Sequence, residues 1–137
     1  MFLLIFMLPL SAVEPPVGAE ALDDDFDGTP DRWETLSESG GLAIYMDTKG
    51  DGSIDYLIEH DEQGYKVYEA MDFNNDGNFD DYYYYRKEVL ANREIDTNFD
   101  GDVDVWVTLS EGVYVTGYER DTDFDGLVDL KKSFGEN

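Results

Sequence analysis

The chain has 137 residues, of which 33 are acidic and 9 are basic, so its formal charge at pH 7 is −24. This charge argues against nucleic acid and anionic membrane surfaces as partners, because both are negative themselves, and it points towards cations. A hydrophobic share of 42% and an aromatic share of 15% argue against a disordered acidic tail, so we expect a domain with a core.

The first twenty residues differ from the rest of the chain. Residues 1–10 form a nearly continuous apolar run that is too short for the roughly 20 residues of a bilayer span, and no Lys or Arg precedes it. We predict a signal peptide and leader over residues 1–20, with cleavage after Ala12 or Ala19; a buried N-terminal strand or a disordered leader are the alternatives. The protein is thus expected to be secreted, periplasmic or on the cell surface, without a membrane span. The sequence contains no cysteine, which excludes disulfides as a source of rigidity.

A nine-residue acidic pattern recurs five times in residues 21–137, which we expect to form a single domain. The copies begin at Asp23, Asp47, Asp72, Asp96 and Asp121, so successive starts are 24, 25, 24 and 25 residues apart. In every copy the first, fifth and ninth residues are Asp and the sixth is Gly. Such regular spacing is typical of a repeat architecture with one supersecondary unit per period.

Segments rich in aromatic and β-branched residues flank the acidic copies and predict β-strands. Those that follow a copy are 56–59, 82–86 and 105–109, and those that precede a copy are 42–46, 66–71 and 113–119. Turn signals occur between successive units at 39–41, 62–64, 91–92 and 110–112. A period of 24–25 residues accommodates two strands, a loop and a turn, but not also a helix of about ten residues.

The predicted fold class is therefore all-β, an antiparallel meander of about nine or ten strands in which β-hairpins are joined by the acidic loops. All the loops would lie along one end of the sheet, roughly 10 Å from one another. We expect the sheet to curl into a barrel or into two layers, because an open sheet with aromatic residues on both faces leaves much apolar surface in water.

One copy of the pattern offers the oxygen ligands that Ca²⁺ prefers. The first, third and fifth residues supply side-chain oxygens, the seventh a backbone carbonyl, and the ninth a carboxylate that binds directly or through water, while the glycine permits a tight turn. We expect up to five Ca²⁺ ions. The predicted ligands are Asp23, Asp25, Asp27, Thr29, Asp31, Asp47, Asp51, Ser53, Asp55, Asp72, Asn74, Asp76, Asn78, Asp80, Asp96, Asn98, Asp100, Asp102, Asp104, Asp121, Asp123, Asp125, Leu127 and Asp129.

These loops resemble the calcium loops of the EF-hand family and, more closely, the nine-residue calcium loops between β-strands in integrin-type propellers and thrombospondin type 3 repeats. An EF-hand also has a Glu at the twelfth position. Here that position holds Glu34, Ile58, Tyr83, Val107 and Lys132 in turn, the flanks do not look helical, and the cysteines of thrombospondin type 3 repeats are absent. The resemblance implies calcium binding at each loop rather than a whole known domain.

The second loop differs from the others at its third position, where Lys49 stands in place of an Asp or Asn. Lys49 removes a ligand and adds a positive charge, so we expect the loop that begins at Asp47 to bind calcium weakly or not at all. A further interpretation is that the Lys49 ammonium acts as a tethered cation in place of an ion.

We predict that calcium binding stabilises the folded repeats, because neighbouring acidic loops repel one another without a cation. Two alternatives remain: each copy is an ordinary solvated turn, which Asp-Gly favours, or bound calcium engages a glycan or protein partner in adhesion or recognition. We predict no enzyme. Acidic residues are so numerous that pairs of carboxylates are no sign of a glycosidase, and no other motif supports a reaction class.

Overall fold

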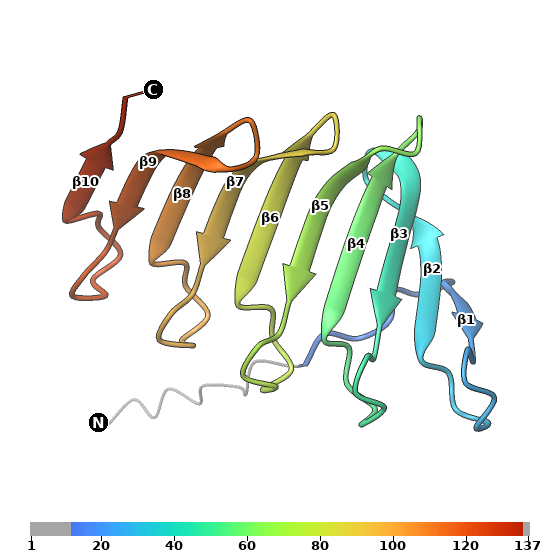
Figure 1. Cartoon of the computed structure of the whole chain (residues 1–137). Coiled ribbons are helices and arrows are strands. Elements are labelled where there is room, and N and C mark those ends of the chain that lie inside the picture. The colour runs from blue at the N-terminus through green and yellow to red at the C-terminus, as the bar shows by residue number, and fades with distance from the viewer. Residues whose placement is uncertain (1–11, 136–137) are drawn as a thin grey trace, which may run out of the picture.

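The computed structural model describes residues 12–135, which form ten antiparallel strands in a single sheet (Figure 1). The strands are β1 (Glu20–Leu22), β2 (Arg32–Leu36), β3 (Gly40–Met46), β4 (Tyr56–Asp61), β5 (Lys66–Met71), β6 (Asp81–Arg86), β7 (Val89–Ile95), β8 (Val105–Ser110), β9 (Tyr114–Arg120) and β10 (Leu130–Ser133). Their order in the sheet is their order in the chain, and the described residues contain no helix. The predicted all-β meander of hairpins is confirmed.

Two kinds of connection alternate along the meander. The five acidic loops join the two strands of each repeat at one end of the sheet, and short turns join successive repeats at the other end (Figure 1). The loops of neighbouring repeats are also tied together through their backbones. The first Asp of one loop donates its N–H to the carbonyl of the last Asp of the loop before it, for example from Asp47 to Asp31 at 2.9 Å and from Asp96 to Asp80 at 2.8 Å.

One predicted turn is wrong. Residues 91–92 lie inside β7, and the chain instead reverses at Lys87 and Glu88, between β6 and β7. Both residues have positive φ, of 49° and 64°, which a two-residue hairpin turn with the twist of its strands requires. Asn and Gly usually occupy such positions, so a Lys-Glu pair carries no turn signal in the sequence.

The expected closure into a barrel or two layers is also wrong, because the ten strands form one open sheet. One face carries a small core of Ala43, Leu57 and Ala70, against which partly buried aromatic rings such as Tyr68 and Tyr82 pack. Tyr84 lies opposite Tyr68 on the same face, with 5.3 Å between the ring centroids. Large rings covering small residues remove apolar surface from water within a single layer, so a second layer is not required.

The opposite face is polar at its centre, which also disfavours burial under another sheet. There the Glu69 carboxylate, in a residue only 8% exposed, accepts hydrogen bonds from the Tyr56 and Tyr85 hydroxyls and from Lys66 Nζ. The Lys66 ammonium also lies 4.2 Å from the centroid of the Tyr85 ring. On the next two strands, Arg93 pairs with the buried Asp81. These groups satisfy one another within the layer.

Replacement of Glu69 by Gln is expected to lower the free energy of unfolding near pH 7 by about 1–3 kcal/mol, because a charged acceptor of three hydrogen bonds is lost. Burial raises the pKa of Glu69, but the bonds from Tyr56, Tyr85 and Lys66 outweigh it and the net shift is downward from 4.5. A carboxyl group whose pKa is lower in the folded state stabilises the protein at pH values above its pKa in the unfolded state. This contribution is lost as the pH falls through the pKa of the folded state.

Urea unfolding of both forms, at pH 7 and then at steps below about pH 4.5, measures this contribution. The difference between Glu69→Gln and the unmodified chain should shrink as the solution is acidified. A difference that stayed constant through this range would show that the Glu69 charge does not contribute to stability.

Part of the predicted leader is described. Residues 1–11 lie outside the described residues, whereas residues 12–19 run from the third acidic loop to β1 without forming a strand. The backbone N–H of Val13 donates to the Gly77 carbonyl at 2.7 Å. Signal cleavage after Ala12 or Ala19 remains a prediction. No helix within residues 12–135 is long and apolar enough to cross a membrane.

Candidate metal centre

The five acidic loops share one backbone conformation. The glycine at the sixth position has a φ between 86° and 96° in each loop, and the residue at the fourth position also has positive φ, between 61° and 69°. At the fourth position stand Phe26, Gly50, Asn75, Phe99 and Phe124. A bulky side chain with positive φ is unfavourable, so the repetition of this conformation indicates that the surrounding loop imposes it.

The first Asp of each loop organises the turn through its carboxylate. In every loop this carboxylate accepts the N–H of the glycine at the sixth position, at 2.9 Å for Asp23 and 2.7 Å for Asp121. In the last four loops it also accepts the N–H of the fourth residue, as Asp96 does from Phe99 at 2.7 Å. The first side chain therefore points to the inside of the loop.

The fifth and ninth Asp residues are held in the same manner. Each fifth Asp accepts the N–H of the seventh residue, such as Asp100 from Asp102 at 3.0 Å. Each ninth Asp accepts the N–H of the second residue, such as Asp104 from Thr97 at 2.7 Å. Such bonds shape a turn whether or not an ion is bound, and they leave carboxylate lone pairs for other partners.

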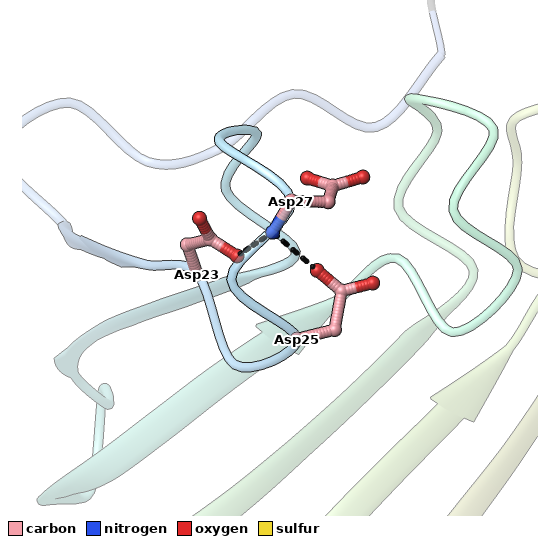
Figure 2. A group of neighbouring side chains, drawn as sticks. All are labelled: Asp23, Asp25 and Asp27. Atoms are coloured by element: carbon pink, nitrogen blue, oxygen red, sulfur yellow. Dashed lines mark hydrogen bonds between the residues drawn. The ribbon is translucent and has the colours of Figure 1, made fainter.

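The third position supplies a side-chain oxygen where the residue is Asp or Asn. Asn74 and Asn98 each donate through Nδ2 to the carboxylate of the fifth Asp at 2.8 Å, and Oδ1 of each accepts the N–H of that same residue. Asp25 likewise accepts the N–H of Asp27 at 3.1 Å. Figure 2 shows the carboxylates of Asp23 and Asp25 converging on this N–H.

In three loops, carboxylate oxygens lie close enough to share one ion. One oxygen from each residue of a triad lies within 4.8 Å of the others in Asp23, Asp25 and Asp27, in Asp72, Asp76 and Asp80, and in Asp121, Asp123 and Asp129. Within residues 12–135 no such triad occurs in the loops that begin at Asp47 and Asp96. The predicted seventh-position ligands Thr29, Ser53, Asn78, Asp102 and Leu127 use their N–H groups to hold the fifth Asp.

Several of these carboxylates are buried in spite of their charge. Asp72 and Asp80 are 4% and 2% exposed in the third loop, and Asp96 and Asp104 are both 3% exposed in the fourth. Burial raises the pKa of Asp80, and the neighbouring Asp72 and Asp76 act in the same direction. Two buried like charges in one loop are costly unless a cation or further hydrogen bonds compensate them.

The second loop contains a cation of its own. Lys49 Nζ lies 3.6 Å from Oδ2 of Asp55, an oxygen that is buried and accepts no hydrogen bond. The third position of this loop thus places an ammonium, instead of a ligand oxygen, beside the ninth carboxylate. This geometry agrees with the interpretation of Lys49 as a tethered cation.

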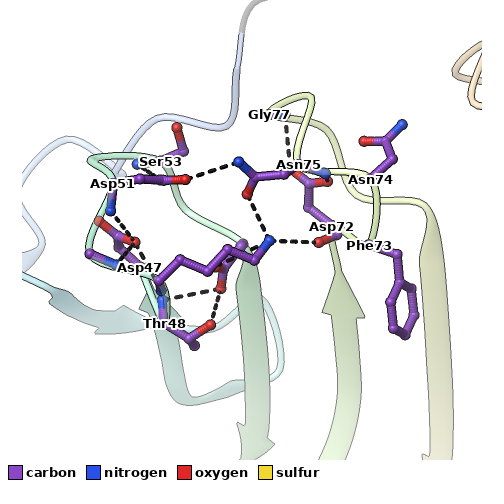
Figure 3. A network of polar contacts seen from close by, with 12 residues as sticks. Asp47, Thr48, Asp51, Ser53, Asp72, Phe73, Asn74, Asn75 and Gly77 are labelled. Atoms are coloured by element: carbon purple, nitrogen blue, oxygen red, sulfur yellow. Dashed lines mark hydrogen bonds and ion pairs between the residues drawn. The ribbon is translucent and has the colours of Figure 1, made fainter.

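Lys49 also reaches the third loop, a contact that the nine-residue pattern does not predict. Its Nζ donates to Asn75 Oδ1 at 2.7 Å and to the Asp72 carbonyl at 3.4 Å. Asn75 in turn donates through Nδ2 to Asp51 at 2.9 Å, and Figure 3 shows the side chains of Asn75 and Asp51 meeting between the two loops. The sequence holds one sign of this contact, because Asn75 occupies the fourth position of its loop, which is Phe in three other loops.

Comparison of the chain with protein-family models, with curated proteins and with solved structures finds no match.

Proposed function

We propose that the protein binds Ca²⁺ in four of its five acidic loops and that the bound ions stabilise the sheet. The observation that carries this proposal is the place of the Lys49 ammonium beside Asp55. Lys49 occupies the third position of its loop, and at the same position the other loops present the oxygens of Asp25, Asn74, Asn98 and Asp123. The other four loops have no lysine at this position and offer a side-chain oxygen there instead.

The chemistry of the four loops fits calcium. Ca²⁺ takes six to eight oxygen ligands in flexible geometry, which short loops rich in Asp and Asn can supply together with backbone carbonyls and water. The buried carboxylates of the third and fourth loops provide the electrostatic reason, because the ion would offset their mutual repulsion. Four ions would carry a charge of +8 and bring the formal charge from −24 to −16.

The proposed role is structural, in an exported protein. Open loops of this type in extracellular modules bind calcium at about 10⁻⁴–10⁻³ M, an affinity that suits permanently calcium-rich surroundings. The backbone bonds between successive loops, such as that from Asp121 to Asp104, give each site a direct connection to the next repeat. An ion that orders one loop therefore also orders the backbone carbonyl to which the next loop is hydrogen-bonded.

The proposal is tested by Asp100→Ala, with Asp51→Ala as the matched control. Both residues occupy the fifth position of a loop, and each accepts the N–H of its seventh residue at 3.0 Å. Asp100→Ala should remove one bound ion, or lower the affinity of that site at least about tenfold, because a ligand carboxylate is lost. Asp51→Ala should leave the calcium count unchanged, because the Lys49 ammonium serves that loop.

Equilibrium dialysis at millimolar free calcium gives the count for each form. The proposal fails if the unmodified chain binds no calcium under these conditions. Equal losses in the two variants would contradict the assignment of the second loop to Lys49.

A further inference from the structure

The sheet ends in two strands that carry opposite charges. Within residues 12–135, β1 and β10 each pair with a single neighbour, so each has a free edge. β10 contributes Lys131 and Lys132, two of the nine basic residues of the chain, whereas β1 begins with Glu20. A free edge presents unpaired backbone groups that can add a further strand.

The internal repeats define how a further strand would align. At each junction between repeats, the first strand residue after one loop pairs with the last residue before the next loop: Arg32 with Met46, Tyr56 with Met71, Asp81 with Ile95, and Val105 with Arg120. By the same rule, Leu130 would pair with Leu22 of a second copy. Because the number of strands is even, β1 of that copy is antiparallel to β10 and its acidic loops stay at the same end.

We propose that the chain assembles head to tail, with β1 of one copy adding to the β10 edge of another in this register. Leu130 then faces Leu22, and two residues further on Lys132 faces Glu20 of the second copy. The N–H of Asp23 of the second copy would donate to the Asp129 carbonyl, which repeats the bond that links successive loops inside the chain. The assembled sheet continues the internal repeat without a change of geometry.

Charge selects this pairing over the others that two free edges allow. Glu20 lies directly opposite Glu34 on β2, but the Glu34 carboxylate already pairs with Arg32 at 2.6 Å. Lys132 of another copy gives Glu20 an opposite charge on its other side. Pairing of β10 with β10 would instead bring lysines together, and pairing of β1 with β1 would give Glu20 no cation as a partner. A head-to-tail contact joins two different edges, so each added copy leaves a free edge and the assembly grows linearly unless the rotation between copies closes it into a ring.

Exposed apolar groups lie beside both edges. A groove of about 730 Å³ beside β9 and β10 is lined by Val113, Tyr114, Tyr118 and Phe134, among others. In the second copy, the fully exposed Val17 lies three residues before β1. Exposed apolar surface beside the β10 edge favours association with a second copy.

Sedimentation velocity of the full chain, over a concentration series at about 0.15 M salt with millimolar calcium, tests the proposal. The sedimentation coefficient of the unmodified chain should rise with concentration above that of a 15.6 kDa monomer. Lys132→Glu and Glu20→Lys should each raise the concentration of half-assembly about tenfold, because an opposite-charge pair becomes a like-charge pair. The double variant should return to within about threefold of the unmodified chain.

Lys87→Glu is the matched control, since it changes the net charge as Lys132→Glu does but lies in the β6–β7 turn, away from both edges. It should shift assembly much less. A chain that stays monomeric, a Lys132→Glu effect no larger than that of the control, or a double variant that does not recover would each overturn the proposal. Calcium binding is measured separately by dialysis, so failure of this contact is distinguishable from failure of the proposed metal sites.

Discussion

Removal of calcium is expected to lower the melting temperature of the chain by roughly 15 °C or more relative to about 10 mM free Ca²⁺. A ligand that binds only the folded state contributes RT ln(1 + [L]/Kd), which is about 2.7 kcal/mol per site at a hundredfold excess over Kd. Four such sites would contribute on the order of 10 kcal/mol, comparable with the whole stability of a typical domain. Binding of Ca²⁺ to the acidic unfolded chain reduces this stabilisation, so the expected fall in melting temperature is smaller than about 10 kcal/mol alone would give.

The melt is followed by circular dichroism in calcium, in chelator, and in chelator with NaCl added to match the ionic strength. Salt alone screens the repulsion between loops only in part, because carboxylates such as Asp80 and Asp104 are buried. The NaCl curve should therefore lie close to the chelator curve. Coincident curves in calcium and chelator would show that folding does not depend on the ions.

The second large effect is expected for Lys49→Asp. This change completes the acidic pattern of the second loop and makes its third position equivalent to Asp123 of the fifth loop, which belongs to a carboxylate triad. In chelator, the variant should lose about 2–4 kcal/mol, because the buried Asp55 loses its cation and gains a like charge. In millimolar calcium it should bind one additional ion and recover most of the loss.

Lys49→Met separates the loss of the ammonium from the gain of a calcium ligand, since it removes the ammonium and supplies no oxygen. It should be destabilised in chelator and in calcium alike, without an additional ion, and should also lose the contacts to Asn75 and Asp72. Urea unfolding and dialysis measure both quantities. If Lys49→Asp bound no additional calcium, the equivalence of the second loop to the others would be refuted.

The meander could be predicted because one sequence rule repeats. Regularly spaced Asp and Gly residues mark the loops, and the strand-forming segments between them leave room only for a hairpin. The predicted strand 66–71 has the same bounds as β5. The Lys87-Glu88 turn carries no composition signal, because its conformation is imposed by the strands that it joins. The open shape depends on pairings such as that of Ala70 with Tyr82, which only the register reveals.

The candidate site was predictable within each loop and unpredictable between loops. The nine-residue pattern predicts which side chains gather, and the shared hydrogen bonds of the first, fifth and ninth Asp residues agree with it. The bridge from Lys49 to Asn75 requires knowledge of which loops are adjacent and how far a lysine extends across the gap. Lys49 and Asn75 both differ from the residues that other loops have at the same positions. Unusual residues in two neighbouring loops are therefore the sequence signal for a side-chain contact between the loops.

The glycine at the sixth position of each loop allows the central claim to be tested site by site. The N–H groups of Gly28, Gly52, Gly77, Gly101 and Gly126 each donate to the first Asp carboxylate of their own loop. Their amide resonances therefore report the state of each carboxylate during a calcium titration followed by NMR. Saturable shifts for Gly28, Gly77, Gly101 and Gly126, with Gly52 largely unchanged, are the predicted result. Five unresponsive glycines, or a Gly52 that shifts like the others, would contradict calcium binding in four loops with Lys49 in the fifth.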